Sequence, residues 1–293
     1  VYKRQFMNAA ELRGVSYIYS ENTPFRKVAV NHIDIAFEEK IITGIIGHTG
    51  SGKSTVSQLL NGLLKPSEGT VEIEGRNIWA EPKKIKEVRF TVGLVFQYPE
   101  YQLFEETVYK DIAFGPKNMG LDESEIDARV RSAAELVGLS PDFFEKSPFD
   151  LSGGQKRRVA IAGVMAMRPK ILILDEPAAG LDPRGRDEII SRIVEYRKKT
   201  DSTVIMISHS MEDMAAYCDK ILVMKEAEPF LYGTPAEVFG KAETLESVGL
   251  SVPQVTKLMI ELRRRGYDVR TDVYTVPQAK AQIERLIGGE VGC

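Results

Sequence analysis

The stretch that decides the fold is GHTGSGKST, residues 47–55, which lies between the apolar run KIITGII (40–46) and a helical pattern over 53–63. It matches the pattern G-x-x-x-x-G-K followed by Ser or Thr. The glycines allow successive backbone N–H groups to point at a phosphate, and the helix N-terminus adds positive potential. A glycine-rich turn with a chance lysine is the alternative, and the flanking strand and helix argue against it. The sequence therefore predicts a loop that binds the phosphates of a nucleotide.

Two side chains of this loop have specific tasks in binding a nucleoside triphosphate. Lys53 is expected to reach the β and γ phosphates, and the Ser54 hydroxyl is expected to ligate Mg²⁺. His48 stands at a variable position of the pattern and is interpreted as exposed filler. The predicted nucleotide-binding residues of the loop are Gly47, His48, Thr49, Gly50, Ser51, Gly52, Lys53, Ser54 and Thr55.

A second motif, ILILDEP, covers residues 171–177. An apolar strand that ends in a carboxylate places Asp175 at the carboxyl edge of the sheet beside the phosphate loop, where it can hold Mg²⁺. Glu176 is then available to orient or deprotonate the water that attacks the γ phosphate. A strand simply capped and turned by Pro177 is the alternative. The presence of the phosphate loop makes us prefer phosphate hydrolysis.

Composition limits the class of protein. The chain has 293 residues, of which 43% are hydrophobic and 28% charged, enough for one large domain and a smaller one. A net charge of −3 gives no electrostatic case for binding nucleic acid or coating anionic lipid. The two cysteines, Cys218 and Cys293, are too few for a disulfide scaffold and fit a reducing cytosol. No apolar run approaches the ~18 residues of a membrane span, and the first residues lack the apolar centre of a secretory signal.

Alternating strand and helix patterns run along the chain. The most apolar strand candidates, at 41–46, 171–175 and 203–208, lack polar alternation, as expected of strands covered on both faces of a parallel sheet. The fold class is therefore α/β, with helices on both faces of the sheet. The expected strands cover 15–19, 28–37, 40–46, 70–75, 91–96, 171–175, 203–208 and 220–224. The expected helices cover 53–63, 123–137, 153–167, 183–198 and 211–217.

The strand patterns also suggest domain boundaries. Residues 105–168 carry no convincing strand pattern and are expected to form a helical subdomain inserted in the core. We expect the main domain to cover 14–235, after an N-terminal extension over 1–13. Residues 1–6 are interpreted as foreign to the natural chain, with Met7 as its start.

The pattern changes after about Gly233. TPAEVF (234–239) and VPQVTKLMIELRRRG (252–266) predict short helices that begin near prolines. We therefore expect a small C-terminal extension over 236–293. It carries no chemical motif.

A third motif, LSGGQ at 151–155, stands between the other two. GHTGSGKST, LSGGQ and ILILDEP in this order resemble the ATP-binding cassette (ABC) ATPases over residues 14–235. The resemblance implies a P-loop NTPase fold of the ABC type, in which the signature of one subunit closes over the γ phosphate held by the other. A serine that caps the following helix is a compatible interpretation. The residues expected to act on the partner's nucleotide are Leu151, Ser152, Gly153, Gly154 and Gln155.

Four further positions match the ABC pattern. Gln97 resembles the Q-loop glutamine that contacts Mg²⁺ and transmits to a partner, and His209 resembles the switch histidine at the γ phosphate. Because a lone histidine is more often a structural hydrogen-bonding group, the second assignment rests on motif order. Asp182 resembles the D-loop aspartate at the dimer seam, with a turn before Pro183 as the alternative.

Tyr19, with Tyr17 as second choice, resembles the aromatic residue that stacks on adenine. Both tyrosines lie on one face of their strand, so plain packing stays open as the alternative.

One departure from the ABC pattern is Ala178, where the family often has Ser or Thr after DEP. It removes no group to which we assign chemistry, so we expect hydrolysis to survive.

The stretch FQYPEYQLFEETVYKDIAFGPKNMG (96–120) is similar to the CbiO-like ATPases of energy-coupling factor (ECF) transporters. That resemblance implies an ATP hydrolase with ATP and Mg²⁺ as cofactors, at the cytoplasmic face of a prokaryotic membrane, powering uptake of vitamins or transition-metal ions. It implies a head-to-tail dimer with a second, paralogous ATPase, a shared transmembrane coupling protein and a substrate-capturing membrane subunit. Nucleic acid is not an expected partner. The extension over 236–293 is expected to be an interface between the ATPases.

Two alternatives stay open at this point. The acidic residues Glu100, Glu105 and Glu106 beside the Q-loop either receive basic groups of the coupling protein or form a solvated helix start. The rival functions are an ATPase of another ABC transporter and a soluble ABC ATPase outside transport. The chain lacks the tandem cassettes or coiled-coil insertion expected of the soluble class, and the residues that a non-hydrolytic module would have lost are present.

Overall fold

The computed structural model of the chain describes residues 8–289, which divide into two compact units. Unit 1 holds residues 8–41 and 54–207, and unit 2 holds residues 42–53 and 208–289. The interpretation of residues 1–6 and of Met7 lies outside the described residues.

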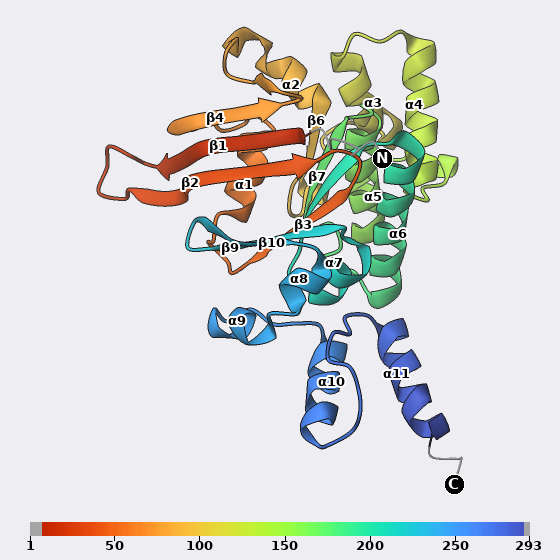
Figure 1. Cartoon of the computed structure of the whole chain (residues 1–293). Coiled ribbons are helices and arrows are strands. Elements are labelled where there is room, and N and C mark those ends of the chain that lie inside the picture. The colour runs from red at the N-terminus through yellow and green to blue at the C-terminus, as the bar shows by residue number, and fades with distance from the viewer. Residues whose placement is uncertain (1–7, 290–293) are drawn as a thin grey trace, which may run out of the picture. The chain divides into compact units, whose positions relative to one another are not determined.

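Unit 1 contains an antiparallel sheet in the order β2-β1-β4-β5 (Figure 1). Its strands are β1 (Asn8–Tyr19), β2 (Lys27–Glu38), β4 (Glu68–Ile73) and β5 (Arg76–Asn77). The predicted strands at 15–19, 28–37 and 70–75 are confirmed. β1, however, begins at Asn8, and it buries Ala10 and Leu12 opposite Phe37 and Ile35 of β2. The predicted domain boundary at residue 14 therefore falls inside a strand. β5 was not predicted because two residues show no period.

Unit 1 also contains three parallel strands, β6 (Val92–Val95), β7 (Ile171–Asp175) and β8 (Thr203–Ile207). Every residue of these strands is buried, as the continuous apolar pattern predicted. Ile171 pairs with Thr203 at one end of the register and Asp175 pairs with Ile207 at the other. The carboxyl ends of the strands therefore lie at one edge, and that edge receives the residues that follow them.

The helices of unit 1 cover these strands. The segment 105–168 contains three of them and two short 3₁₀ helices, and no strand lies in this described span. The predicted helices at 123–137, 153–167 and 183–198 are confirmed. The helix at 85–91 was missed because it has no buried residue and hence no apolar period. The helices are α1 (Lys53–Leu60, whose first residue belongs to unit 2), α2 (Ile85–Thr91), α3 (Val108–Asn118), α4 (Glu123–Leu136), α5 (Gly153–Met165) and α6 (Pro183–Thr200).

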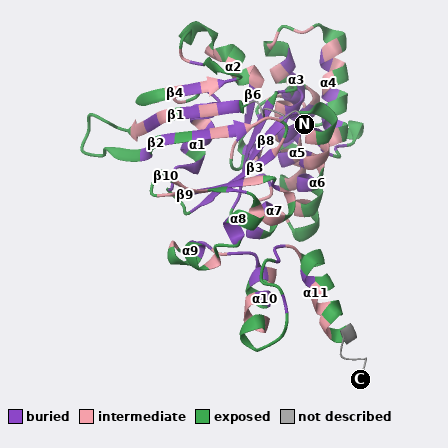
Figure 2. Ribbon diagram, in the orientation of Figure 1, coloured by how far each residue is buried: buried purple, intermediate pink, exposed green. Residues whose placement is uncertain are grey.

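Unit 2 is built on β3 (Ile42–Gly47), which runs parallel to β9 (Lys220–Lys225). β10 (Glu228–Gly233) pairs antiparallel with β9 and was not predicted. All residues of β3 are buried (Figure 2). The helices of unit 2 are α7 (Met211–Tyr217), α8 (Pro235–Phe239), α9 (Ala242–Ser247), α10 (Gln254–Arg264) and α11 (Val276–Gly289). No helix in the described part of the chain is long and apolar enough to cross a bilayer.

The C-terminal extension has a small core of its own. Met259 of α10 packs with Val269, Val273 and Ala279, and the Thr256 hydroxyl donates to the carbonyl of Val273 at 2.6 Å. As predicted, the helices begin at prolines, since α8 starts with Pro235 and α10 follows Pro253, whereas α9 and α11 were not predicted.

The packing of β3 generates a prediction for Gly44. A Cβ at this position would meet Sγ of Cys218 at 2.8 Å and Sδ of Met214 more closely still, and both atoms lie in a buried part of unit 2. We expect Gly44→Ala to lower the free energy of unfolding by about 1–3 kcal/mol because overpacking forces neighbours off their rotamers. Chemical denaturation measures this change.

The matched control is Gly153→Ala, since a Cβ at Gly153 would meet nothing within 4 Å. We expect its unfolding midpoint to equal that of the wild type. An unchanged midpoint for Gly44→Ala would contradict the packing described for β3.

Candidate nucleotide site

The phosphate loop lies between the end of β3 at Gly47 and the start of α1 at Lys53. Gly50 and Gly52 adopt φ values of 82° and 102°, in the left-handed region that favours glycine. This conformation turns successive N–H groups toward the inside of the loop. Thr49 and Gly50 are exposed, whereas Ser51, Gly52 and Lys53 are buried.

The Lys53 ammonium is held inside the loop. Its Nζ donates to the carbonyl oxygens of Gly47 and His48 at 2.7 and 2.9 Å. Among the described residues, the buried Ser51 hydroxyl has no hydrogen-bond partner. A phosphate oxygen would satisfy this hydroxyl, and the ammonium supplies charge beside it. The loop therefore fits the phosphates of ATP.

His48 is not exposed filler, which corrects the sequence interpretation. Its ring is exposed, but Nε2–H donates to the carbonyl oxygen of Val248 at 2.7 Å. Val248 is the C-cap residue that follows helix α9, 200 residues further along the chain. Sequence pattern offered no signal for this partner, because position 48 is variable in the loop motif.

Ser54 and Asp175 bring the first and second motifs together. Ser54 Oγ donates to Asp175 Oδ2 at 2.7 Å, although 121 residues separate them. Asp175 is the last residue of β7 and is buried. A hydroxyl and a carboxylate are oxygen ligands that Mg²⁺ accepts alongside phosphate oxygens. The donor set therefore fits a magnesium ion.

Glu176 follows Asp175 in a strained conformation. Its φ is 52°, rare for a residue with a side chain, and its N–H donates to the carbonyl of Ile207 at 2.9 Å. Strain of this kind costs about 1–3 kcal/mol and concentrates at functional sites. Asp175 and Glu176 therefore differ in backbone conformation, the first at the end of a strand and the second in the turn that follows it.

The signature LSGGQ opens α5. Ser152 caps the helix, because its Oγ accepts from the Gln155 N–H at 3.4 Å while Gln155 Oε1 accepts from the Ser152 N–H at 2.9 Å. The capping interpretation is thus confirmed. Capping by Ser152 does not explain the glycine at position 153. Gly153 is exposed, and a Cβ added there would meet nothing within 4 Å. The fold of this chain leaves room for a side chain at that position, so the described residues give no internal reason for a glycine there. Leu151 is buried beneath the loop.

Asp182 lies close to the signature. Both Asp182 and Ser152 line a hollow of about 380 Å³, together with Gly154, Gln155 and Leu181. Asp182 Oδ1 accepts from the Gly185 N–H at 2.7 Å and so caps α6, as the turn interpretation predicted. Its side chain remains exposed.

Gln97 and His209 are exposed and follow strands by two residues each. Gln97 follows β6, whose carboxyl end lies in register with that of β7, so it stands at the edge that carries Asp175. His209 follows β8 along the chain and belongs to unit 2. Both residues therefore follow strands, as expected. The contacts of Gln97 with Mg²⁺ and of His209 with the γ phosphate stay a prediction.

Tyr19 lies beside the helix that follows the phosphate loop. Its hydroxyl is 3.4 Å from Oγ1 of Thr55, and its ring meets that of Tyr17 edge to face with centroids 4.8 Å apart. Burial raises the pKa of Tyr17, whereas Tyr19 is 37% exposed. Tyr19 is thus the more exposed ring of the pair, and it also packs against Tyr17.

The sequence interpretation missed Arg157, two residues beyond the signature. Its buried guanidinium donates through Nε and one Nη to Glu100 at 3.1 and 3.0 Å, and through the other Nη to the carbonyl of Ala179. One side chain therefore joins α5 to the turns that follow Gln97 and Glu176. The KRR run after LSGGQ was the visible signal, but it could not identify these partners.

This contact changes the interpretation of the acidic cluster beside the Q-loop. Glu100 is bound within the chain by Arg157 and is not a free acceptor for a partner's basic group. Glu106 pairs with Lys110 one helical turn later, and this hydrogen bond lowers the pKa of Glu106. The solvated helix start therefore describes Glu106.

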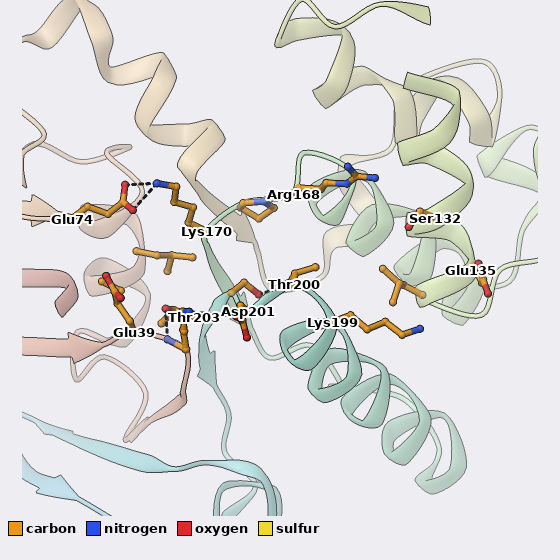
Figure 3. A pocket seen from close by; sticks show the side chains of 16 residues that line it. Glu39, Glu74, Ser132, Glu135, Arg168, Lys170, Lys199, Thr200, Asp201 and Thr203 are labelled. Atoms are coloured by element: carbon orange, nitrogen blue, oxygen red, sulfur yellow. Dashed lines mark hydrogen bonds and ion pairs between the residues drawn. The ribbon is translucent and has the colours of Figure 1, made fainter. Parts of the chain in front are cut away.

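A cavity of about 570 Å³ in unit 1 lies elsewhere (Figure 3). It is lined by Ile171 and Thr203, the first residues of β7 and β8, and by the ion pair of Lys170 with Glu74. Asp175 is the last residue of β7, and strands rise about 3.3 Å per residue. The cavity thus sits at the amino ends of the strands, and it contains no predicted site residue.

Comparison with protein families supports the motif assignment. A family model described as "ABC transporter" matches residues 30–179. A second model, described as "AAA domain, putative AbiEii toxin, Type IV TA system", matches 145–214, a span that contains the signature and β7.

Several similar proteins carry the name "Energy-coupling factor transporter ATP-binding protein EcfA2". The protein from Caldanaerobacter subterraneus subsp. tengcongensis is 56% identical, covering 95% of this chain and 98% of the relative. Those from Clostridium acetobutylicum and Clostridium perfringens are 53% and 52% identical, each covering 94% of this chain and 97% and 98% of the relatives.

Solved structures show the same architecture. The structure of cbiO1 from Clostridium perfringens, described as part of the ABC transporter complex cbiONQ, has a TM-score of 0.73 and 41% identity, covering 86% of this chain and 99% of that one. The dimeric structure of MJ0796, a bacterial ABC transporter cassette, has a TM-score of 0.70 and 25% identity, covering 77% and 98%.

The geometry of the phosphate loop predicts the effect of Lys53→Ala. We expect the Kd for ATP to rise about 10- to 150-fold, because charge-assisted hydrogen bonds to phosphate are worth about 1.5–3 kcal/mol. Equilibrium binding of a fluorescent ATP analogue measures the change.

The control for this measurement is Lys65→Ala, which removes an exposed lysine outside the loop and should leave the Kd unchanged. Unaltered ATP binding by the Lys53 variant would contradict the assignment of the loop.

Proposed function

Since the chain belongs to the ABC transporter ATPases, and among them to the ATP-binding proteins of energy-coupling factor transporters, we propose that it powers an ECF importer through the residues described above. The single observation that carries the assignment of the site is the contact between Ser54 Oγ and Asp175 Oδ2 at 2.7 Å. It brings a phosphate loop and a carboxylate-bearing strand end to one point. ATP hydrolysis needs both at that point.

In the proposed mechanism the loop binds ATP through backbone N–H groups, and Lys53 neutralises charge on the β and γ phosphates. Ser54, Asp175 and Gln97 would hold Mg²⁺, which would neutralise charge on the β and γ phosphates as the bond to the leaving ADP breaks. Glu176 orients the attacking water and accepts its proton. His209 hydrogen-bonds the γ phosphate.

Closure of a dimer completes the site. The exposed Ser152 hydroxyl and the N–H groups at the start of α5 face outward, and Gly153 leaves room for a close approach. A phosphate on the partner's loop fits this helix N-terminus. Driving a switch from mostly open to mostly closed takes about 5.5 kcal/mol of differential binding. Charge-assisted hydrogen bonds of about 1.5–3 kcal/mol each, made at two sites, can supply it.

The second ATPase would be a paralogue, and Asp182 would lie at the seam beside the signature. The C-terminal extension presents exposed apolar side chains that an interface between ATPases would cover. These are Leu258, Tyr267, Val276 and Ile287.

The transmembrane coupling protein would dock beside the Q-loop. Aromatic side chains gather there and are exposed, with Phe104 and Phe114 edge to face at 4.9 Å and Tyr98 next to Tyr101 at 6.2 Å. Exposed aromatic groups of this kind are enriched at protein interfaces. Docking here would transmit opening and closing of the dimer to the membrane.

The cargo would be a vitamin or a transition-metal ion, selected by a separate membrane subunit that captures it. The chain itself would stay at the cytoplasmic face of the membrane as a peripheral subunit. The name of the structural relative, part of the complex cbiONQ, supports assembly with further subunits.

Glu176→Gln tests the chemical role. The variant should still bind ATP. Because it loses the base, it should hydrolyse ATP at least about 100-fold more slowly and accumulate as a closed dimer. Phosphate release and size-exclusion chromatography with ATP measure both effects.

Glu195→Gln, at a partly exposed position of α6 where the carboxylate pairs with Lys199, is the control and should keep wild-type turnover. Ordinary turnover in the Glu176 variant would remove Glu176 from the mechanism.

Co-purification tests the transport role. We expect the tagged chain, extracted from membranes with a mild detergent, to retain a related ATPase and a polytopic membrane protein. Reconstituted with them in vesicles, it should drive ATP-dependent uptake. Recovery with ribosomes or DNA instead would favour a soluble ABC ATPase and overturn the proposal.

A further inference from the structure

Two contacts tie the C-terminal extension to the nucleotide-binding side of unit 2. The first is the hydrogen bond from His48 Nε2 to the carbonyl of Val248, at 2.7 Å. The second runs from the Gln254 N–H to Oε1 of Glu212, at 3.1 Å. Glu212 belongs to the first turn of α7, three residues after His209. We call residues 248–254 the strap.

The strap is a packed segment. At the end of α9 the Leu250 N–H donates to the Leu245 carbonyl at 2.9 Å, which closes the helix. Leu245, Leu250 and Val252 are buried, with 0%, 7% and 1% of their surfaces exposed. The first residues of the strap are therefore held against the rest of the extension. A displacement of the residue that contacts them would be passed on to the extension.

Gly249 makes the approach of His48 possible. Its φ of 72° lies in the left-handed region, and a Cβ there would meet His48 Nε2 at 2.8 Å. A side chain at position 249 would therefore displace the imidazole from the Val248 carbonyl. The glycine serves both the backbone turn and the contact.

The backbone of His48 lies next to the phosphate-binding groups. Its carbonyl oxygen accepts from Lys53 Nζ at 2.9 Å and from the Ser51 N–H at 3.1 Å. The side chain of the same residue reaches the strap. One residue thus joins the extension to the lysine that binds the phosphates.

We propose that His48 is a positioning residue that couples ATP binding in the phosphate loop to the C-terminal extension through the strap. The inference rests on the proposed function only in that the loop binds ATP. When phosphates draw Lys53 away from the His48 carbonyl, the loop shifts and the strap responds. Because coupling is reciprocal, a strap held in place also favours ATP binding.

The experiment compares His48→Ala and His48→Gln in the assembled transporter complex. Removing one hydrogen bond that holds the loop should raise the Kd for ATP about 3- to 10-fold in the alanine variant. The glutamine variant retains a donor of similar reach and should recover most of the affinity. We expect kcat to change little, since no group in contact with the attacking water is lost.

Amide hydrogen exchange measures an effect that a purely structural role of His48 would not produce. In the wild type, ATP should change the exchange of residues 242–264, and this response should disappear in His48→Ala and return in His48→Gln. Glu246→Gln, an exposed change on α9, is the control and should behave as the wild type. If the alanine variant does not fold, His48→Asn replaces it, because asparagine is too short to reach Val248.

The inference is overturned if His48→Ala keeps both the wild-type Kd and the ATP-dependent exchange response. It is also overturned if His48→Ala and His48→Gln weaken ATP binding equally and both keep the wild-type change in hydrogen exchange on adding ATP. That result would indicate a local structural role for His48. Lys53→Ala distinguishes a failure of this inference from a failure of the proposed function. If that change left ATP binding unaffected, the loop would not be the nucleotide-binding site.

Discussion

The hydrogen bond between Ser54 and Asp175 is the interaction on which the site depends. It joins the start of the helix after the phosphate loop to the end of a buried strand, 121 residues later in the chain. Parallel strands make this possible, because residues that follow their carboxyl ends collect at one edge. Asp175 and Glu176 stand at that edge, and Glu176 has a positive φ. In the proposed mechanism, binding of the metal and activation of water would fall to these adjacent residues.

In the proposed dimer, the same chain would also contribute half of a second site. Ser152 caps α5 from within, while the open space at Gly153 has no use inside the chain. A helix N-terminus that is capped, exposed and unobstructed can still receive a phosphate from outside. Asp182 lines the same hollow. These features give a physical reason for the pairing of two ATPases, each of which would complete the other's nucleotide site.

Two side chains, one buried and one exposed, connect these sites to the rest of the chain. Arg157 binds Glu100 near the Q-loop and the carbonyl of Ala179, so a shift of either turn acts on the helix that carries the signature. His48 links the phosphate loop to the C-terminal extension, and both of these belong to unit 2. Nucleotide binding is local, but through such contacts it would act on both the surface beside the Q-loop and the extension.

The sequence by itself determined the α/β class, the buried parallel strands and the phosphate loop, because these depend on local backbone and on apolar period. It also indicated Asp175, Glu176 and the signature, since motif order carries that information. Only the tertiary structure decided the partners of Glu100 and His48 and the start of β1 at Asn8. Those contacts join residues far apart in the chain, and the same side chains would have looked equally suited to solvent. Local pattern shows which groups can bond, whereas three-dimensional packing selects the partner.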